Sequence, residues 1–235
     1  MPDESPARAS EFHCRPGECI DCCTHDRLLI PVTLSDLYRA WVYDRKVKGE
    51  RKPFYEVFDE RCAGFTATPC LDNRGSQVVV IRSKVPCYNV DYEGMRCAVH
   101  GKVQYAGCGL CPEERLLPED RRYEANELRQ TAEFFAAMDC LKGVTLTTER
   151  AEHIRRLRAL AMDEVWMTSA LLSHGLPRQR AKNPKVFGRE MRNHVRYISE
   201  KAMPTLWMNV RQTMPRYAEL YVDDAETRAL LLEGA

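Results

Sequence analysis

The segment Cys14-Arg-Pro-Gly-Glu-Cys19-Ile-Asp-Cys22-Cys23 places four thiols within ten residues, and Pro16 and Gly17 predict a loop there. A second block of cysteines follows much later in the chain, at Cys87, Cys97, Cys108 and Cys111. Thiolates from separated blocks suit zinc, copper(I) and iron–sulfur clusters. The two blocks together therefore predict one metal-binding region, in which metal ligation supplies the order that little regular structure provides.

A disulfide framework is a poor explanation for these cysteines. The chain has 235 residues and an odd count of 11 cysteines, whereas disulfide frameworks are typical of short secreted chains. The polar, acid-containing start lacks the apolar core of a signal peptide, and no later stretch is apolar enough to span a bilayer. We therefore expect a reducing cytoplasm and no membrane association. Cys140 is expected in a helical core, while Cys62 and Cys70 are ligands, core residues or incidental surface thiols.

Composition is that of a globular protein without a strong charge bias. Hydrophobic residues make up 44% of the chain and the net charge is +1, so no overall attraction to nucleic acids or membranes is expected. One local basic run, 178–196, stands out. A solvated helix face is the main interpretation, and contact with RNA, phosphate or an acidic partner is the alternative. Its basic residues are Arg178, Arg180, Lys182, Lys185, Arg189, Arg192 and Arg196.

Local patterns predict short strands in the first half and helices in the second. Thr33 and Asp36 form a capping-box pattern that opens a helix. Thr147 and Thr148 are expected to cap a long helix that ends before Gly175. Strands are predicted at 28–32 and 78–81, and helices at 34–48, 54–61, 120–141, 148–173, 185–202, 205–220 and 223–233.

These elements predict an α+β fold that is mostly α. We expect a disordered tail at 1–11, a cysteine-cluster metal-binding domain at 12–118 and a helical region at 119–235 packed on it. Only Leu116-Leu-Pro-Glu separates the two halves, which is too short for a flexible tether. Some helices should therefore cover the metal centre with apolar side chains, for which Phe134, Phe135, Trp166 and Trp207 are the candidates.

The spacing of the cysteines is compatible with two kinds of metal centre, a zinc ion or an iron–sulfur cluster. One tetrahedral zinc could take Cys19 and Cys22 with Cys108 and Cys111. The doublet favours an iron–sulfur cluster, because consecutive side chains of an extended segment point apart and fit poorly on one small ion. We therefore expect a cluster, most simply [4Fe–4S], with zinc as the alternative.

Three ordered segments resemble the YkgJ-type cysteine-cluster family, which is described as zinc- or iron-chelating. They are Cys14…Cys19-x-x-Cys22-Cys23, Ile30-Pro-Val-Thr-Leu-Ser-Asp36-Leu-Tyr-Arg39, and Cys87…Cys97-Ala-Val-His100…Cys108. The resemblance covers roughly residues 12–115. It implies Cys19, Cys22, Cys23, Cys87, Cys97 and Cys108 as ligand candidates. A related cluster in flagellin lysine methylases points to an iron–sulfur centre.

The chain departs from this family at two places. Four residues follow Cys14 where the family has two, and Gln104-Tyr-Ala-Gly107 stands where an Arg-Pro precedes the closing cysteine. Cys111 can therefore replace or supplement Cys108. No glycine-rich cofactor loop of the strand–turn–helix kind is present in the sequence, so the resemblance does not extend to methyl transfer.

The histidines are expected to have ordinary roles. His13, His25 and His100 lie beside the cysteine blocks, where a histidine can ligate or support a ligand, but solvated loops and packing are the preferred interpretations. His153, His174 and His194 lie in the helical half and are expected as surface or satisfied core residues. The sequence shows no Ser-His-Asp arrangement, so no catalytic residue is assigned.

Three functions fit these observations. The first is a module that holds an iron–sulfur cluster and passes electrons or a redox state to a partner or client protein. The second is a metalloenzyme whose cluster keeps an open iron site for substrate. The third is a structural zinc module that docks a protein or RNA through 178–196.

Overall fold

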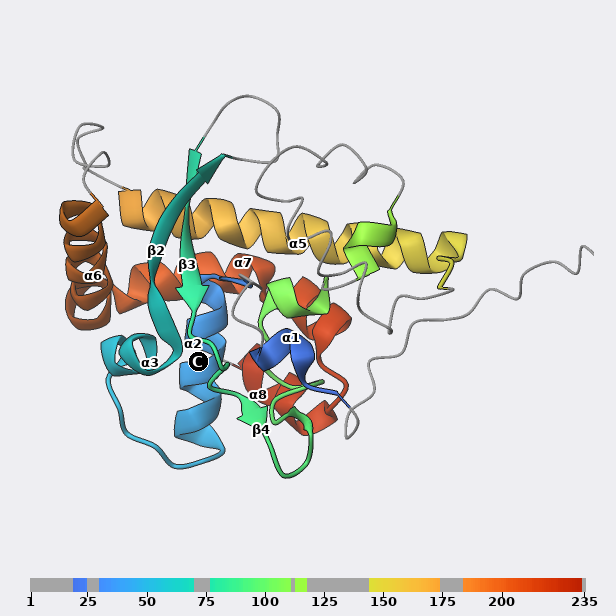
Figure 1. Cartoon of the computed structure of the whole chain (residues 1–235). Coiled ribbons are helices and arrows are strands. Elements are labelled where there is room, and N and C mark those ends of the chain that lie inside the picture. The colour runs from blue at the N-terminus through green and yellow to red at the C-terminus, as the bar shows by residue number, and fades with distance from the viewer. Residues whose placement is uncertain are drawn as a thin grey trace, which may run out of the picture.

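The computed structural model describes residues 19–24, 30–69, 77–110, 113–117, 144–173 and 184–233. It shows an α+β fold that is mostly α, as the sequence predicts (Figure 1). The predicted tail, the first and last candidate ligands, Cys14 and Cys111, and the predicted helix 120–141 lie outside the described residues.

The described elements follow one another from the cysteine region to the helices. In the first half they are α1 (Asp21–Thr24), β1 (Pro31–Val32), α2 (Leu34–Lys46), α3 (Phe54–Arg61), β2 (Cys62–Pro69), β3 (Gln77–Ser83), β4 (Val90–Asp91), β5 (Arg96–Cys97), and the 3-10 helices η1 (Ala106–Gly109) and η2 (Glu113–Leu116). The second half contributes α5 (Thr148–Ser173), α6 (Pro184–Lys201), α7 (Met203–Tyr221) and α8 (Ala225–Glu233).

The main sheet is antiparallel with the strand order β1-β3-β2. The strand predicted at 78–81 is the centre of this sheet, but sequence patterns missed its long partner β2. A register irregularity at Gly64 interrupts β2, and Gly64 has a φ of +152°, which L side chains rarely adopt. Cys62 lies at the start of this strand and is only 2% exposed, so it is a core residue.

Helix α2 begins where the capping-box pattern predicts. The hydroxyl of Thr33 accepts a hydrogen bond from the backbone N–H of Asp36 at 3.0 Å, and the Asp36 carboxylate accepts one from the Thr33 N–H at 2.9 Å. These bonds satisfy donors that a helix start otherwise leaves unpaired. The rest of α2 is almost wholly buried, so this helix forms the centre of the molecule.

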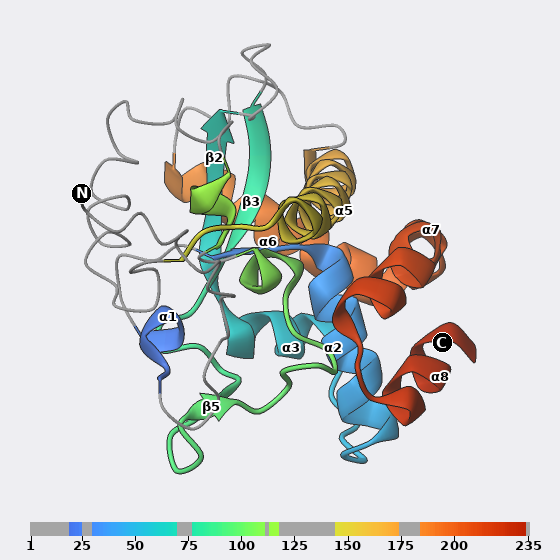
Figure 2. The same cartoon turned by 90° about the vertical axis from the view of Figure 1, so that its right-hand side faces the viewer.

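Helix α5 supports both the sheet and the start of α2. Its Ser169 hydroxyl accepts a hydrogen bond from the Val79 N–H of β3 at 3.0 Å, and its Thr168 hydroxyl accepts one from the Leu34 N–H at 2.8 Å. Figure 2 shows α5 end-on, between the sheet and α7. The long helix of the second half therefore supplies acceptors for two backbone N–H groups of the first half.

A fully buried ionic cluster joins these helices. Arg39 of α2 donates to Asp36 at 2.6 Å and to Glu164 of α5 at 2.6 and 2.8 Å, and all three side chains are 0% exposed. The Glu164 carboxylate also accepts a hydrogen bond from the Thr213 hydroxyl of α7 at 3.0 Å. The guanidinium lies 3.6 Å from the centroid of the Tyr217 ring. Three helices from both halves of the chain therefore meet at one arginine.

The remaining helices pack around this centre. Helix α6 contacts α3, and α8 contacts α7. One continuous core contains residues of the sheet, α2, α3, α5, α6 and α7. Among the residues that the structure describes, none of the helices has the length and apolar character needed to cross a lipid bilayer.

Replacement of Glu164 by alanine should lower the free energy of unfolding by about 3–5 kcal/mol, because it leaves the buried Arg39 charge short of a partner. Urea unfolding followed by far-UV circular dichroism measures this change. Asp163→Ala is the matched control, since the neighbouring Asp163 pairs with Arg216 at 2.5 Å but is 53% exposed. Its effect should stay within about 1 kcal/mol. Equal losses for the two variants would contradict a central role for the cluster.

Candidate metal centre

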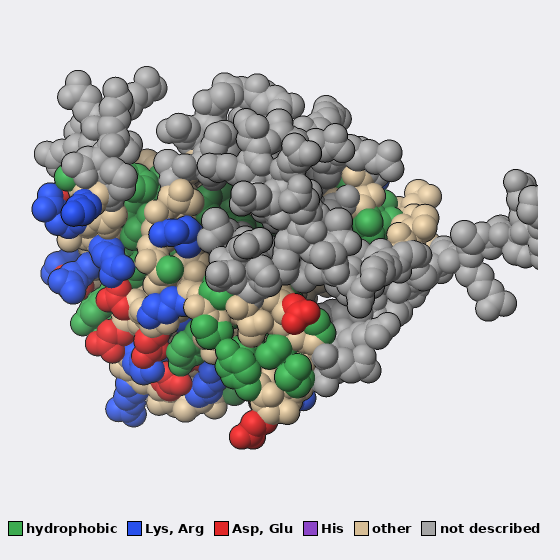
Figure 3. Space-filling view, in the orientation of Figure 1, with side chains coloured by type: hydrophobic (Ala, Val, Ile, Leu, Met, Phe, Trp, Pro, Cys, Tyr) green, Lys and Arg blue, Asp and Glu red, His purple; other side chains and the backbone are tan. Residues whose placement is uncertain are grey.

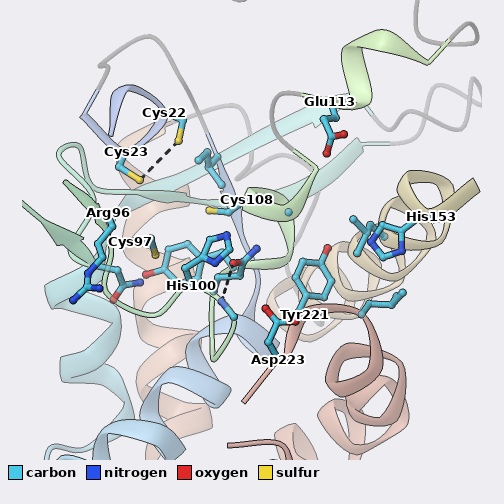
Figure 4. Close-up of a pocket in the computed structure, with 18 of the residues that line it drawn as sticks. Cys22, Cys23, Arg96, Cys97, His100, Cys108, Glu113, His153, Tyr221 and Asp223 are labelled. Atoms are coloured by element: carbon cyan, nitrogen blue, oxygen red, sulfur yellow. Dashed lines mark hydrogen bonds between the residues drawn. The ribbon is translucent and has the colours of Figure 1, made fainter. Parts of the chain in front are cut away.

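Cysteines from both blocks line one cavity of about 770 Å³. Figure 4 shows Cys22, Cys23 and Cys97 on one side of it, with the sulfur of Cys108 turned toward them. Of the eight candidate ligands, six line this cavity, and they are Cys19, Cys22, Cys23, Cys87, Cys97 and Cys108. Cys14 and Cys111 fall outside the described residues.

The cysteine doublet lies in a helical turn and not in an extended loop. Cys22 and Cys23 belong to α1, and the Cys23 N–H donates to the Ile20 carbonyl at 2.9 Å. Neighbouring side chains on a helix diverge less than those of a strand, and the two Sγ atoms are 3.9 Å apart. The expectation that the doublet points apart is therefore wrong, and the two thiols can serve one centre.

A backbone hydrogen bond joins the two cysteine blocks directly. The Cys87 N–H donates to the Cys23 carbonyl at 2.8 Å. The Cys87 carbonyl in turn accepts from the Val90 N–H at 3.1 Å. Val90 is paired with Cys97 across the β4–β5 hairpin, so the doublet, Cys87 and Cys97 follow one continuous path of backbone contacts.

A buried arginine fixes the segment that carries Cys87. Arg61 of α3 donates to the Asn89 side chain at 3.0 Å and forms an ion pair with Asp44 of α2. Its guanidinium also lies 4.4 Å from the centroid of the Tyr88 ring. Tyr88 and Asn89, which directly follow Cys87, are therefore held by α2 and α3, and this fixes the position of Cys87.

Helices α2 and α7, one from each half of the chain, fix the turn that carries Cys108. The Asp36 carboxylate accepts a hydrogen bond from the Ala106 N–H at 2.8 Å, and the Tyr221 hydroxyl donates to the Ala106 carbonyl at 2.8 Å. Gly109 lies against the same ring, because an added Cβ would come within 2.3 Å of Tyr221. Only glycine fits at this position without a shift of the ring. The turn η1 is thus clamped between α2 and α7.

Opposite the cysteines, the cavity has a polar wall that sequence reasoning did not identify. Figure 4 shows Glu113, His153 and Tyr221 on this side, and Arg150 donates to Glu113 at 2.9 Å. His100, expected to pack, also lines the cavity. Burial lowers the pKa of His153. These residues come from η2, α5, α7 and the loop after β5, so no sequence spacing relates them.

Helices α5 and α7 contribute apolar side chains to the cavity, but not the tryptophans that were expected to cover it. Leu157 of α5 and Leu220 of α7 line the cavity. Trp207 instead stacks on Tyr38, with ring centroids 5.7 Å apart, and Trp166 is 39% exposed. The candidates Phe134 and Phe135 lie outside the described residues.

The electrostatics of the thiols reflect their crowding. The hydrogen bond with Cys23 lowers the pKa of Cys22 to about 7. That same bond raises the pKa of Cys23, and burial and the nearby charges of Cys22, Cys108 and Cys87 raise it further. Burial also raises the pKa of Cys87 and of Cys19. The set therefore resists full ionisation unless a positive charge accompanies it.

Across the described part of the chain, no group of three or more His, Cys, Asp or Glu side chains stands close enough to hold a metal ion. The described thiols therefore share a cavity without forming a closed coordination shell. Metal ligation at this place would require the thiols to draw together, which is common when a site forms only with its metal.

No family model, curated protein or solved structure matches the chain. The family resemblance described from the sequence therefore rests on the quoted residues alone.

In metal-free, reduced protein, alkylation should distinguish the two thiols of the doublet. Because the pKa of Cys22 lies at about 7, its thiolate and its reaction rate should increase as pH is raised from 6 to 8. Cys23, whose pKa is raised, should react much more slowly at pH 8. Iodoacetamide pulses with peptide mass spectrometry measure both rates. Buried Cys62 is the unreactive control, and equal rates at Cys22 and Cys23 would refute this assignment.

Proposed function

We propose that this chain is a cysteine-ligated metal protein and that its centre is an iron–sulfur cluster held between the two cysteine blocks. The Cys87–Cys23 backbone hydrogen bond at 2.8 Å carries the proposal, because it joins the two cysteine blocks at the doublet itself, across 63 intervening residues. Six candidate thiols on one cavity support it.

The chemistry of the donors fits such a centre. Thiolates are the ligands of iron–sulfur clusters, and a cluster accepts ligands spread around a larger object than one ion. Crowding of Cys23 by Cys22, Cys87 and Cys108 raises its pKa, and a bound cation offsets that cost. Ligand candidates in the described residues are Cys19, Cys22, Cys23, Cys87, Cys97 and Cys108, with Cys14 and Cys111 as further candidates.

The function that follows from a fully cysteine-ligated cluster is electron transfer, or the holding of a redox state for a partner protein. The surface near the second block supports such a role. Tyr88 and Tyr92 beside Cys87 and β4 are 41% and 58% exposed, and exposed aromatic side chains are common in protein contacts.

Structural zinc is the second candidate, and one distance favours it. Zinc–sulfur bonds of about 2.3 Å in a tetrahedron place two sulfurs about 3.8 Å apart. The Cys22 and Cys23 sulfurs are 3.9 Å apart, which matches one edge of such a site. A metalloenzyme with an open iron site is the third candidate, favoured by the polar wall of Glu113, Arg150 and His153 across the cavity.

Anaerobic purification followed by metal and acid-labile sulfide analysis, visible absorption and electron paramagnetic resonance tests the proposal. We expect iron with sulfide in similar amounts and a brown protein. The double variant Cys22→Ser/Cys23→Ser should lose more than 90% of the iron. Cys62→Ala is the matched control and should retain it, because Cys62 is buried in β2, away from the cavity lining.

Single serine variants at Cys87, Cys97 and Cys108 then identify the ligands from the second block. A colourless protein with stoichiometric zinc and no sulfide would replace the cluster by the zinc alternative. Full metal content in the doublet variant would refute both.

A further inference from the structure

A second cavity, of about 530 Å³, lies between α3 and α6, apart from the cysteine cavity. Its floor is apolar, since Phe58 of α3 and Val195 of α6 line it and are buried. Its rim is basic. Lys185, Arg189, Arg192 and Arg196 all line it, and all four come from α6.

The spacing of these basic residues places them in one row. Arg189, Arg192 and Arg196 follow Lys185 by four, seven and eleven residues, which is the spacing of side chains on one face of a helix. At about 1.5 Å per residue, the row extends for about 16 Å. Figure 3 shows Lys and Arg side chains gathered over α6. The local basic run of the sequence is therefore a linear array beside a hollow.

The residues that line this cavity carry more positive than negative charge, and one neighbouring acid, Glu190 of α6, lies 3.9 Å from Arg189. Among the described residues that line it, four are basic and one, Asp59, is acidic. Asp59 pairs with Arg192 at 3.2 Å, and both side chains are about half exposed, so the pair contributes little and can exchange for another anion. Arg196 lies over the Tyr55 ring, 5.2 Å from its centroid. That contact holds its guanidinium at the rim of the cavity.

A glycine keeps the hollow open. Gly188 stands inside α6, where glycine is a poor helix former, and it lines the cavity. No atom lies within 4 Å of a Cβ built on it, so packing does not require glycine there. A side chain at 188 would enter the hollow between the basic residues.

We propose that this groove binds a ligand carrying several phosphate groups in a row. Guanidinium groups bind phosphate oxygens with two parallel hydrogen bonds, and three of the four basic residues are arginines. The length of the row favours an extended phosphodiester strand, and a free polyphosphate chain shares the same chemistry. This site is independent of the metal centre, because no residue lines both cavities.

Fluorescence anisotropy of full-length protein with 5′-fluorescein octauridylate, at low salt, measures binding, and inorganic tripolyphosphate serves as the competitor. Arg189→Gln/Arg192→Gln should weaken binding at least tenfold and flatten its salt dependence, because fewer counterions are released. Asp59→Asn should strengthen binding severalfold, because it removes the acidic partner of Arg192. Arg211→Gln, an exposed arginine on α7, is the matched control and should change affinity less than twofold.

Gly188→Leu separates binding from folding. Leucine is the better helix former, so the melting temperature should not fall, while its side chain fills the hollow and weakens binding at least fivefold. Octauridylate binding without tripolyphosphate competition supports a strand as the ligand, and effective competition supports a free polyphosphate. Failure of both probes to bind, or equal effects of Arg189→Gln/Arg192→Gln and Arg211→Gln, would overturn the proposal.

Discussion

The burial of the Arg39 guanidinium is the constraint on which the rest of the molecule depends. A charge with no access to water is tolerated only if fixed partners surround it, and removal of one partner leaves it uncompensated. Asp36 lies one helical turn away, but Glu164 lies on α5 and brings its own partner Thr213 from α7. Burial lowers the pKa of Arg39, but the charges of Glu164 and Asp36 outweigh that effect and raise it. The arginine therefore stays charged, and its pairing with Glu164, which Thr213 also binds, ties α2 to α5 and α7.

Helix α2, which carries Arg39, also positions the second cysteine block through two separate contacts. Asp36, which binds Arg39, accepts the Ala106 N–H of the turn that carries Cys108. Asp44, two turns further along α2, binds Arg61, which in turn holds Asn89 beside Cys87. Rigid supports of this kind orient ligands in metal sites. Packing around α2 is therefore transmitted to the cysteine segments through polar contacts to the Ala106 backbone and to the Asn89 side chain.

Features with local causes could be predicted from the sequence, and features that join distant segments could not. The capping box of Thr33 and Asp36 and the hydroxyl of Thr147 at the start of α5 act within four residues, and both form as expected. Strand β2 was missed because its sequence, Cys62-Ala-Gly-Phe-Thr-Ala-Thr-Pro69, contains alanine, glycine and proline, which are depleted in strands. The four-residue helix α1 is too short for a periodic signal, so the geometry of the doublet was misjudged. The polar wall with Glu113 and His153 exists only because tertiary packing brings separate elements together.

Although the net charge of the chain is only +1, two local regions have an unbalanced charge of opposite kinds. One cavity gathers thiols whose crowding resists ionisation, and a bound cation would offset that cost. The other gathers four basic side chains around a hollow with one acid, so its chemistry calls for an anion. Helix α3 is connected to both places, since Arg61 at its end supports the Cys87 segment and Asp59, two residues earlier, lines the basic groove. Near-neutral total charge therefore excludes a uniformly charged surface, but it does not exclude charged ligands at either place.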